Sequence, residues 1–137
     1  MVKEDNMRIS VLLAFIITLV ACSAQSMRGN FEMSINQYSE LVRKHNLDAA
    51  SLFTTEALAE EFRARVKAAK NMRVVDYRIV GTKYYEEKGE AEAQVEIDYY
   101  TLATYRLKTL VDVQKWAYLD EGGKKQWRLT SLLPEFR

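Results

Sequence analysis

Few residues in this 137-residue chain could carry chemistry. His45 is the single histidine, and the unperturbed pKa of histidine lies near neutrality, so this side chain could act as a general base. Tyr38 and Tyr99 could orient a ligand through their hydroxyl groups. We predict that these three side chains line a pocket, and we assign no residue a catalytic role.

Each of these residues also has a structural interpretation. His45 falls at the end of a predicted helix, where the helix dipole favours positive charge. Tyrosines at such positions are often core residues whose hydroxyl reaches water. The chain has no Ser-His-Asp order, no Gly-rich phosphate loop and no paired-carboxylate motif. Whether the chain is an enzyme stays open, and the sequence favours a non-enzymatic domain.

Cys22 is the only cysteine, and it ends an apolar stretch. The run from Ile9 to Ala21 is almost entirely apolar and follows the positive charge of Arg8. A membrane-spanning helix needs roughly 20 apolar residues, so this shorter run is typical of a signal peptide. Translation from Met7 would start such a signal cleanly, and a longer leading segment from Met1 is the alternative.

The four residues Leu19-Val20-Ala21-Cys22 resemble the lipobox of bacterial lipoproteins. The resemblance implies that diacylglycerol is joined to the Cys22 thiol. It also implies cleavage just before Cys22 and acylation of the new amino terminus by a fatty acid such as palmitate. The partner would then be a bacterial membrane. Ser23 favours the outer membrane of a Gram-negative cell, because an aspartate there favours the inner membrane. An ordinary secretory signal, cut for instance after Ala24, is the alternative.

The composition is that of one globular domain. Hydrophobic residues make up 48% of the chain and charged residues 28%, with a formal net charge of +1. Such a chain has no net field to attract nucleic acid. With one histidine and no cysteine pair, a His/Cys zinc site is excluded, and we expect neither a metal nor a cofactor.

We divide the chain into three parts. Residues 1–21 form the signal peptide, 22–32 the lipidated cysteine and a tether, and 33–137 the folded domain. The tether is poor in apolar residues, although the part near Phe31 could instead be an ordered arm along the domain.

Helical periodicity comes first in the domain. Ser34 and Gln37 fit a capping box, which predicts that a helix begins there. Its predicted buried stripe consists of Ile35, Tyr38, Leu41, Val42 and His45. A short helix is expected over 47–53, and a third helix runs from a cap at Thr54 or Thr55 to about Lys70.

From residue 72 the period changes to two, which predicts four strands at 73–85, 90–102, 106–119 and 126–133. The clearest strand places Ala91, Ala93, Val95, Ile97 and Tyr99 toward the core. The third strand carries apolar residues on both faces. We place its face with Asp112, Gln114, Trp116 and Tyr118 away from the core, although a one-residue slip would reverse this. Short connections make the sheet antiparallel, and helices followed by strands indicate an α+β fold.

The predicted outer face of the sheet combines aromatic and charged residues. Tyr100, Trp116 and Tyr118 are expected there among carboxylates and Arg78. Such a face is typical of a protein interface. Its partner would be a second copy of the chain or another envelope protein, and the alternative is that these side chains only shield the sheet.

The order of elements from Phe31 to Phe136 resembles the nuclear transport factor 2-like family, also called the cystatin-like cone. The resemblance rests on three segments: the helix corner at 46–53, Gln114-Lys115-Trp116 in the third strand, and Trp127-Arg128-Leu129 after a glycine turn. The resemblance implies N-terminal helices packed on one face of a curled four-stranded antiparallel sheet. It also implies a pocket on the concave face, dimerisation through the sheet face, and similarity to small lipoproteins that carry this domain.

Overall fold

A computed structural model describes residues 26–137 of the chain. The first helix covers 26–43 within this range. It is followed by α2 (Leu47–Ala50), by 3-10 turns at Ser51–Phe53 and Glu56–Leu58, and by α3 (Ala59–Ala68). The strands are β1 (Met72–Tyr85), β2 (Glu90–Thr101), β3 (Lys108–Glu121) and β4 (Lys124–Leu129), with a 3-10 turn at Glu86–Lys88 between β1 and β2.

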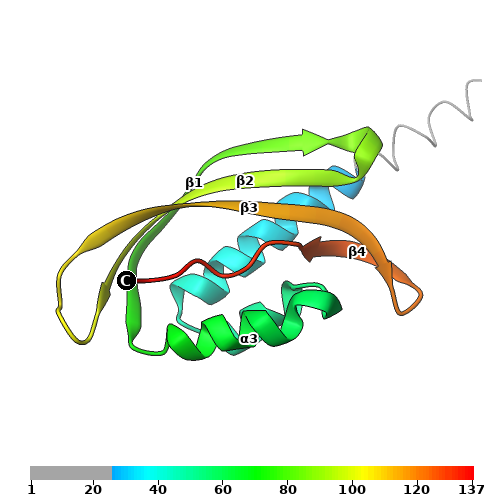
Figure 1. Cartoon of the computed structure of the whole chain (residues 1–137). Coiled ribbons are helices and arrows are strands. Elements are labelled where there is room, and N and C mark those ends of the chain that lie inside the picture. The colour runs from blue at the N-terminus through cyan, green and yellow to red at the C-terminus, as the bar shows by residue number, and fades with distance from the viewer. Residues whose placement is uncertain (1–25) are drawn as a thin grey trace, which may run out of the picture.

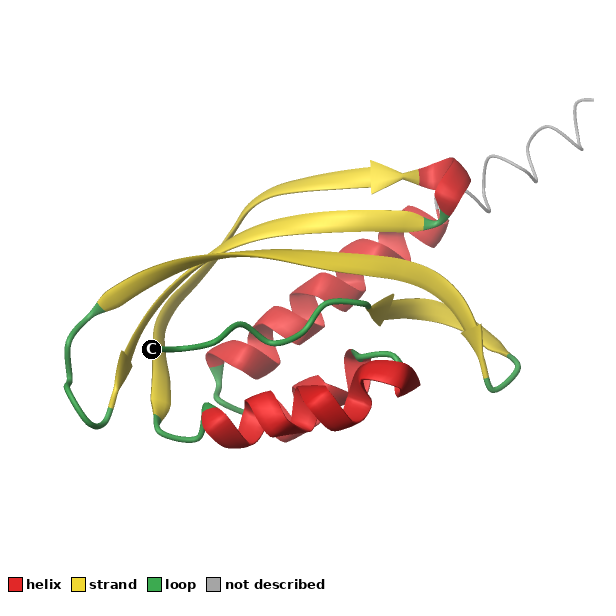
Figure 2. Ribbon diagram, in the orientation of Figure 1, coloured by secondary structure: helices red, strands yellow, loops and turns green. Residues whose placement is uncertain are grey.

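The four strands form one antiparallel sheet in the order β1-β2-β3-β4. The sheet curls, and the helices lie on its concave side (Figures 1 and 2). This confirms the predicted α+β class with helices on one face of a curled four-stranded sheet. The observed strands lie close to the predicted ranges, and the short helices occur in the predicted order.

The first helix corrects the predicted tether and domain start. Residues 26–32 are already helical, and Phe31 is buried with 2% of its surface exposed. Ser34 is not the amino-terminal cap, because its Oγ donates to the Asn30 carbonyl one turn back, as in a helix interior. Phe31 and Ile35 share one face, so burial of Phe31 extends the helix through a polar stretch. Cys22 and the signal segment lie outside the described residues.

The concave face of β2 agrees with its predicted alternation. Ala91, Ala93, Val95, Ile97 and Tyr99 are all buried, and residues between them are more exposed. Buried residues of the first helix, Phe31, Ile35, Tyr38 and Val42, pack into the same core.

The predicted faces of β3 are wrong by one residue. Trp116 pairs with buried Ala91, and Gln114 pairs with buried Ala93, so both side chains point into the concave side. Val111 and Val113 instead lie on the outer face and are largely exposed. Both faces of β3 carry apolar residues, so the strand's own sequence does not decide between them, and pairing with β2 does.

The chain after β4 closes the free edge of β3. β4 ends at Leu129, shorter than the predicted 126–133, and the following residues run beside β3 without forming a strand. The Thr130 amide donates to the Lys115 carbonyl at 2.8 Å, and Leu133 is buried.

No helix within 26–137 is long and apolar enough to cross a membrane.

Candidate functional site: the two faces of the sheet

The concave face holds a small polar cluster within the apolar core. Gln114 Nε2 donates to the Tyr77 hydroxyl at 2.6 Å, and the Trp116 indole donates to Gln114 Oε1 at 3.4 Å. Burial raises the pKa of Tyr77 to about 12 and that of Tyr38 well above its usual value. Both tyrosines therefore stay neutral near neutral pH, and the Tyr77 hydroxyl accepts a hydrogen bond from Gln114.

Asp112 is a partly buried carboxylate on this face of β3, and the prediction had placed it on the outer face. Its cross-strand neighbour is buried Val95. Burial raises the pKa of Asp112 to about 6, which the amide of Val113 only partly offsets. Among residues 26–137 no ion pair joins Asp112 to a basic side chain. A carboxyl group with this pKa can accept or donate a proton near neutrality.

The predicted pocket residues have separate partners. Tyr38 packs edge-on against Trp116, with ring centroids 5.7 Å apart. The Tyr99 hydroxyl donates to the Arg137 carbonyl at 2.8 Å and accepts from its amide. His45 lies at the end of the first helix beside Arg73. Of the three, Tyr38 is the one that lies near Asp112, whose charge contributes to the raised pKa of Tyr38.

The geometry of His45 favours its structural interpretation. The Arg73 guanidinium only donates hydrogen bonds, so the contact at 3.2 Å makes His45 Nε2 the acceptor and places the ring proton on Nδ1. Nδ1 is itself buried and has no partner among the described residues. The lone pair that a general base would use is therefore already engaged by Arg73.

His45 also occupies a backbone position that suits glycine. Its φ is 57°, in the left-handed region. The amide of His45 donates to the Val42 carbonyl and that of Asn46 to the Leu41 carbonyl, the paired bonds of a Schellman motif. His45 is thus the residue that ends the helix.

We expect His45→Gly to raise the free energy of unfolding by about 0.5–1 kcal/mol. Glycine removes a left-handed strain of about 1–2 kcal/mol but adds freedom to the unfolded chain. Urea unfolding measures the change, and His45→Ala is the matched control, because it also loses the ring but keeps the strain. Loss of stability in both variants would show that the ring contacts outweigh the strain.

The convex face is organised around Arg78. Its guanidinium contacts Asp98 at 2.8 Å, Glu96 at 3.1 Å and also Asp76. Arg78 holds the pKa values of Asp76 and Asp98 below their usual values. Three carboxylates against one guanidinium leave this cluster with an excess of negative charge.

Exposed valines lie near the Arg78 cluster on β1 and β3. Val75 and Val80 sit at the two register shifts of β1, while Val111 and Val113 lie across the sheet on β3. All four are exposed, at 48–58% of their surface. Of the predicted interface residues, Tyr100 belongs to this face and stacks on Tyr105. Trp116 and Tyr118 do not, because β3 presents them to the concave side.

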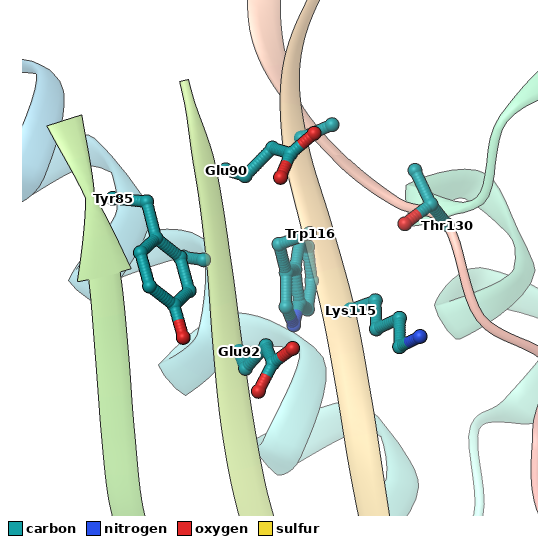
Figure 3. A pocket seen from close by; sticks show the side chains of 8 residues that line it. Tyr85, Glu90, Glu92, Lys115, Trp116 and Thr130 are labelled. Carbon is teal, nitrogen blue, oxygen red and sulfur yellow. The ribbon is translucent and has the colours of Figure 1, made fainter. Parts of the chain in front are cut away.

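The described residues line several surface cavities. A hollow of about 340 Å³ lies where β1, β2 and β3 meet the chain after β4 (Figure 3). Its polar side chains are Tyr85, Glu90, Glu92, Lys115 and Thr130. A hollow of about 200 Å³ lies on the convex face beside Gly81 and Val113. A groove of about 550 Å³ between the first helix and Phe53 includes Leu41 and Lys44. None of these three is lined by Asp112, Tyr38, His45 or Tyr99.

Comparisons with known proteins give matches among solved structures alone. No protein-family model matches the chain, and neither does any curated protein. Among solved structures, it is similar to a Xanthomonas campestris pv. campestris protein described as a "putative polyketide cyclase". The TM-score is 0.48 and the identity 11%, covering 77% of this chain and 92% of the other. The fold of the chain is shown by its own strand pairing.

Proposed function

We propose that the chain is a bacterial envelope lipoprotein whose nuclear transport factor 2-like domain binds a protein partner and catalyses no reaction. The observation that carries the proposal is the convex face, where exposed Val111 and Val113 lie on the same face as an acidic cluster, with exposed Val75 and Val80 at the register shifts of the neighbouring β1. When such a face packs against a partner, its apolar side chains supply the buried contact and its charged side chains set specificity. The lipobox at Leu19–Cys22 supplies the anchor, and Ser23 favours the outer membrane.

The packing of the concave side supports binding over catalysis. Phe31, Tyr38 and Trp116 fill the space between the sheet and the first helix, with ring centroids 5.7–6.4 Å apart. His45 and Tyr99 are engaged with Arg73 and Arg137. A partner therefore has its largest accessible sheet surface on the convex side.

The anchor is tested by mass spectrometry of the membrane-extracted protein. We expect wild-type protein to begin at Cys22 and to carry the added mass of diacylglycerol and a fatty acid. Cys22→Ala should lose this mass and leave the membrane fraction. Wild-type protein that is soluble and unmodified would contradict the anchor.

The convex face is tested by adding a charge at one of its exposed valines. We expect Val111→Lys to abolish cross-linking to the partner, whether a second copy of the chain or another envelope protein, because a desolvated lysine opposes the contact. Leu52→Lys is the matched control, since Leu52 is 72% exposed on the 3-10 turn at Ser51–Phe53. Light scattering of the detergent-solubilised protein identifies a homodimer. A monomer that recovers no partner, or equal loss in both variants, would count against this face.

A second candidate function follows from Asp112. A partly buried carboxylate without a basic partner among the described residues favours a small-molecule site on the concave face, in which Asp112 exchanges a proton with a ligand and Tyr77 and Gln114 orient it. Such a ligand would have to displace core side chains. Binding of such a ligand would slow hydrogen exchange of the amides near Asp112. The ligand would also bind more weakly to the Asp112→Asn variant than to wild-type protein.

A further inference from the structure

The first helix is fixed to one particular end of the sheet. The Trp127 indole of β4 donates to the Met27 carbonyl at 2.9 Å. The Arg28 guanidinium lies over the Tyr84 ring of β1, 5.6 Å from its centroid. Phe31 packs between the same two strands, with its ring centroid 5.1 Å from that of Trp127 and 6.1 Å from that of Tyr84. Three independent contacts therefore hold the start of the described chain against this end.

Two turns form this end of the sheet. One is the β1–β2 connection at Glu86–Lys88, which follows the pair Tyr85–Glu90. The other is the β3–β4 turn, closed by the pair Glu121–Lys124. We call these two turns the anchor end. The loop 102–107 follows the other end of β2, and Figure 1 shows it at the opposite side of the molecule from the β1–β2 connection.

The distance between the two ends is large compared with the reach of the anchor. β2 has 12 residues, which at about 3.3 Å each would span roughly 40 Å if straight. Cys22 precedes the first described residue, Ser26, by four positions, and four extended residues reach at most about 14 Å. A lipid on Cys22 would therefore hold the anchor end close to the head groups while the loop 102–107 remains free to lie beyond them.

We infer that the anchor end faces the lipid surface and that the loop 102–107 projects away from it. This inference rests on the proposed lipidation of Cys22. The anchor end and the residues beside it carry both signs of charge. The positive side chains are Arg28, Lys88, Lys124 and Lys125, and the negative ones are Glu86, Glu87, Asp120 and Glu121. Such a surface suits zwitterionic head groups and has no net requirement for anionic lipid. The orientation is therefore set by the anchor and by the rigid attachment of the helix.

This orientation has a consequence for partners. Tyr105 and Leu107 are 71% and 66% exposed in the outward loop. The convex face lies along the length of the sheet between the two ends. Both surfaces would therefore stay accessible while the protein is anchored, and neither would be buried against the membrane.

Depth-dependent fluorescence quenching tests the orientation in the full-length lipidated protein. Lipidation blocks the only native thiol, so a single introduced cysteine can be labelled with a fluorophore. We would place it at Lys88→Cys and Lys125→Cys in the anchor end, and at Ala103→Cys in the distal loop; all three positions are exposed. The proteins are reconstituted into phosphatidylcholine vesicles that contain a head-group quencher.

We expect severalfold stronger quenching at Lys88→Cys and Lys125→Cys than at Ala103→Cys, with the same ranking after anionic lipid is added. Equal quenching at all three positions, or the strongest quenching at Ala103→Cys, would overturn the orientation. The mass of Cys22 is measured on the same samples. An unmodified Cys22 would overturn the proposed anchor itself, whereas a lipidated protein with the wrong ranking would overturn the orientation alone.

Discussion

Replacing Trp116 with alanine is expected to lower the free energy of unfolding by about 3–5 kcal/mol. Trp116 is 1% exposed and is surrounded by the rings of Phe31, Tyr38 and Phe53, whose centroids lie 5.7–6.4 Å away. Removing the indole leaves a cavity at the centre of this cluster and releases its hydrogen bond to Gln114. Urea unfolding followed by circular dichroism measures the loss.

Val113→Ala is the matched control for this prediction because Val113 lies on the same strand with its side chain on the other face. It is 48% exposed, so its truncation should change the free energy of unfolding by no more than about 0.5 kcal/mol. The two variants together test the face of β3. A large loss for Val113→Ala with a small loss for Trp116→Ala would mean that β3 has the opposite orientation.

The parts of the fold that could be predicted are those with one consistent pattern. β2 alternates small and apolar residues with charged ones, so its concave face follows directly from the sequence. The period also changes cleanly from helical to two near residue 72, where β1 begins. These two signals, with short connections between strands, are enough to define an α+β fold with an antiparallel sheet.

The face of β3 could not be predicted because its own sequence fits both orientations. Exposed Val111 and Val113 are as apolar as the residues of a core face, and buried Gln114 is polar. Register with β2 decides, and register is a property of the pair of strands. The wrong face of β3 also led to wrong site predictions. Trp116 was assigned to an interface, and Asp112 was placed on the outer face and not on the concave face.

The prediction of where the first helix starts was wrong for a different reason. Ser34 and Gln37 match a capping box, which is a local signal, whereas burial of Phe31 against Tyr84 and Trp127 is a tertiary contact. Tertiary burial of Phe31 outweighs a weak local signal that would start the helix at Ser34. One clue was present in the sequence, since Phe31 lies one turn before Ile35 on the predicted apolar stripe.

Replacing Asp112 with asparagine is expected to stabilise the protein at neutral pH. Burial raises the pKa of Asp112 from 3.8 to about 6, which means that ionising this carboxyl costs the folded state roughly 3 kcal/mol at neutral pH, as an upper estimate. Asparagine has nearly the same shape and carries no charge. We therefore expect a gain on the order of 2 kcal/mol at pH 7.5, measured by urea unfolding.

The sign of the pH dependence separates this effect from a change in packing. Between pH 4 and 6 the folded protein keeps the Asp112 proton while the unfolded chain loses it, so the contribution of Asp112 to wild-type stability falls as the pH rises. The advantage of Asp112→Asn should be close to zero below pH 4, grow across this range and level off above pH 7. A gain that is the same at every pH would contradict the titration of Asp112.

Asp98→Asn is the control with the opposite sign. Arg78 lowers the pKa of Asp98, so its charge stabilises the folded state above the unfolded pKa and this contribution is lost as the pH falls. The asparagine variant should therefore be less stable than wild type at pH 7.5. If Asp112→Asn gains stability and Asp98→Asn does not, the Asp112 carboxylate lowers the stability of the folded protein and is not needed for folding. Carboxyl groups with a perturbed pKa cluster at functional sites, so this result would strengthen the concave-face candidate against the convex one.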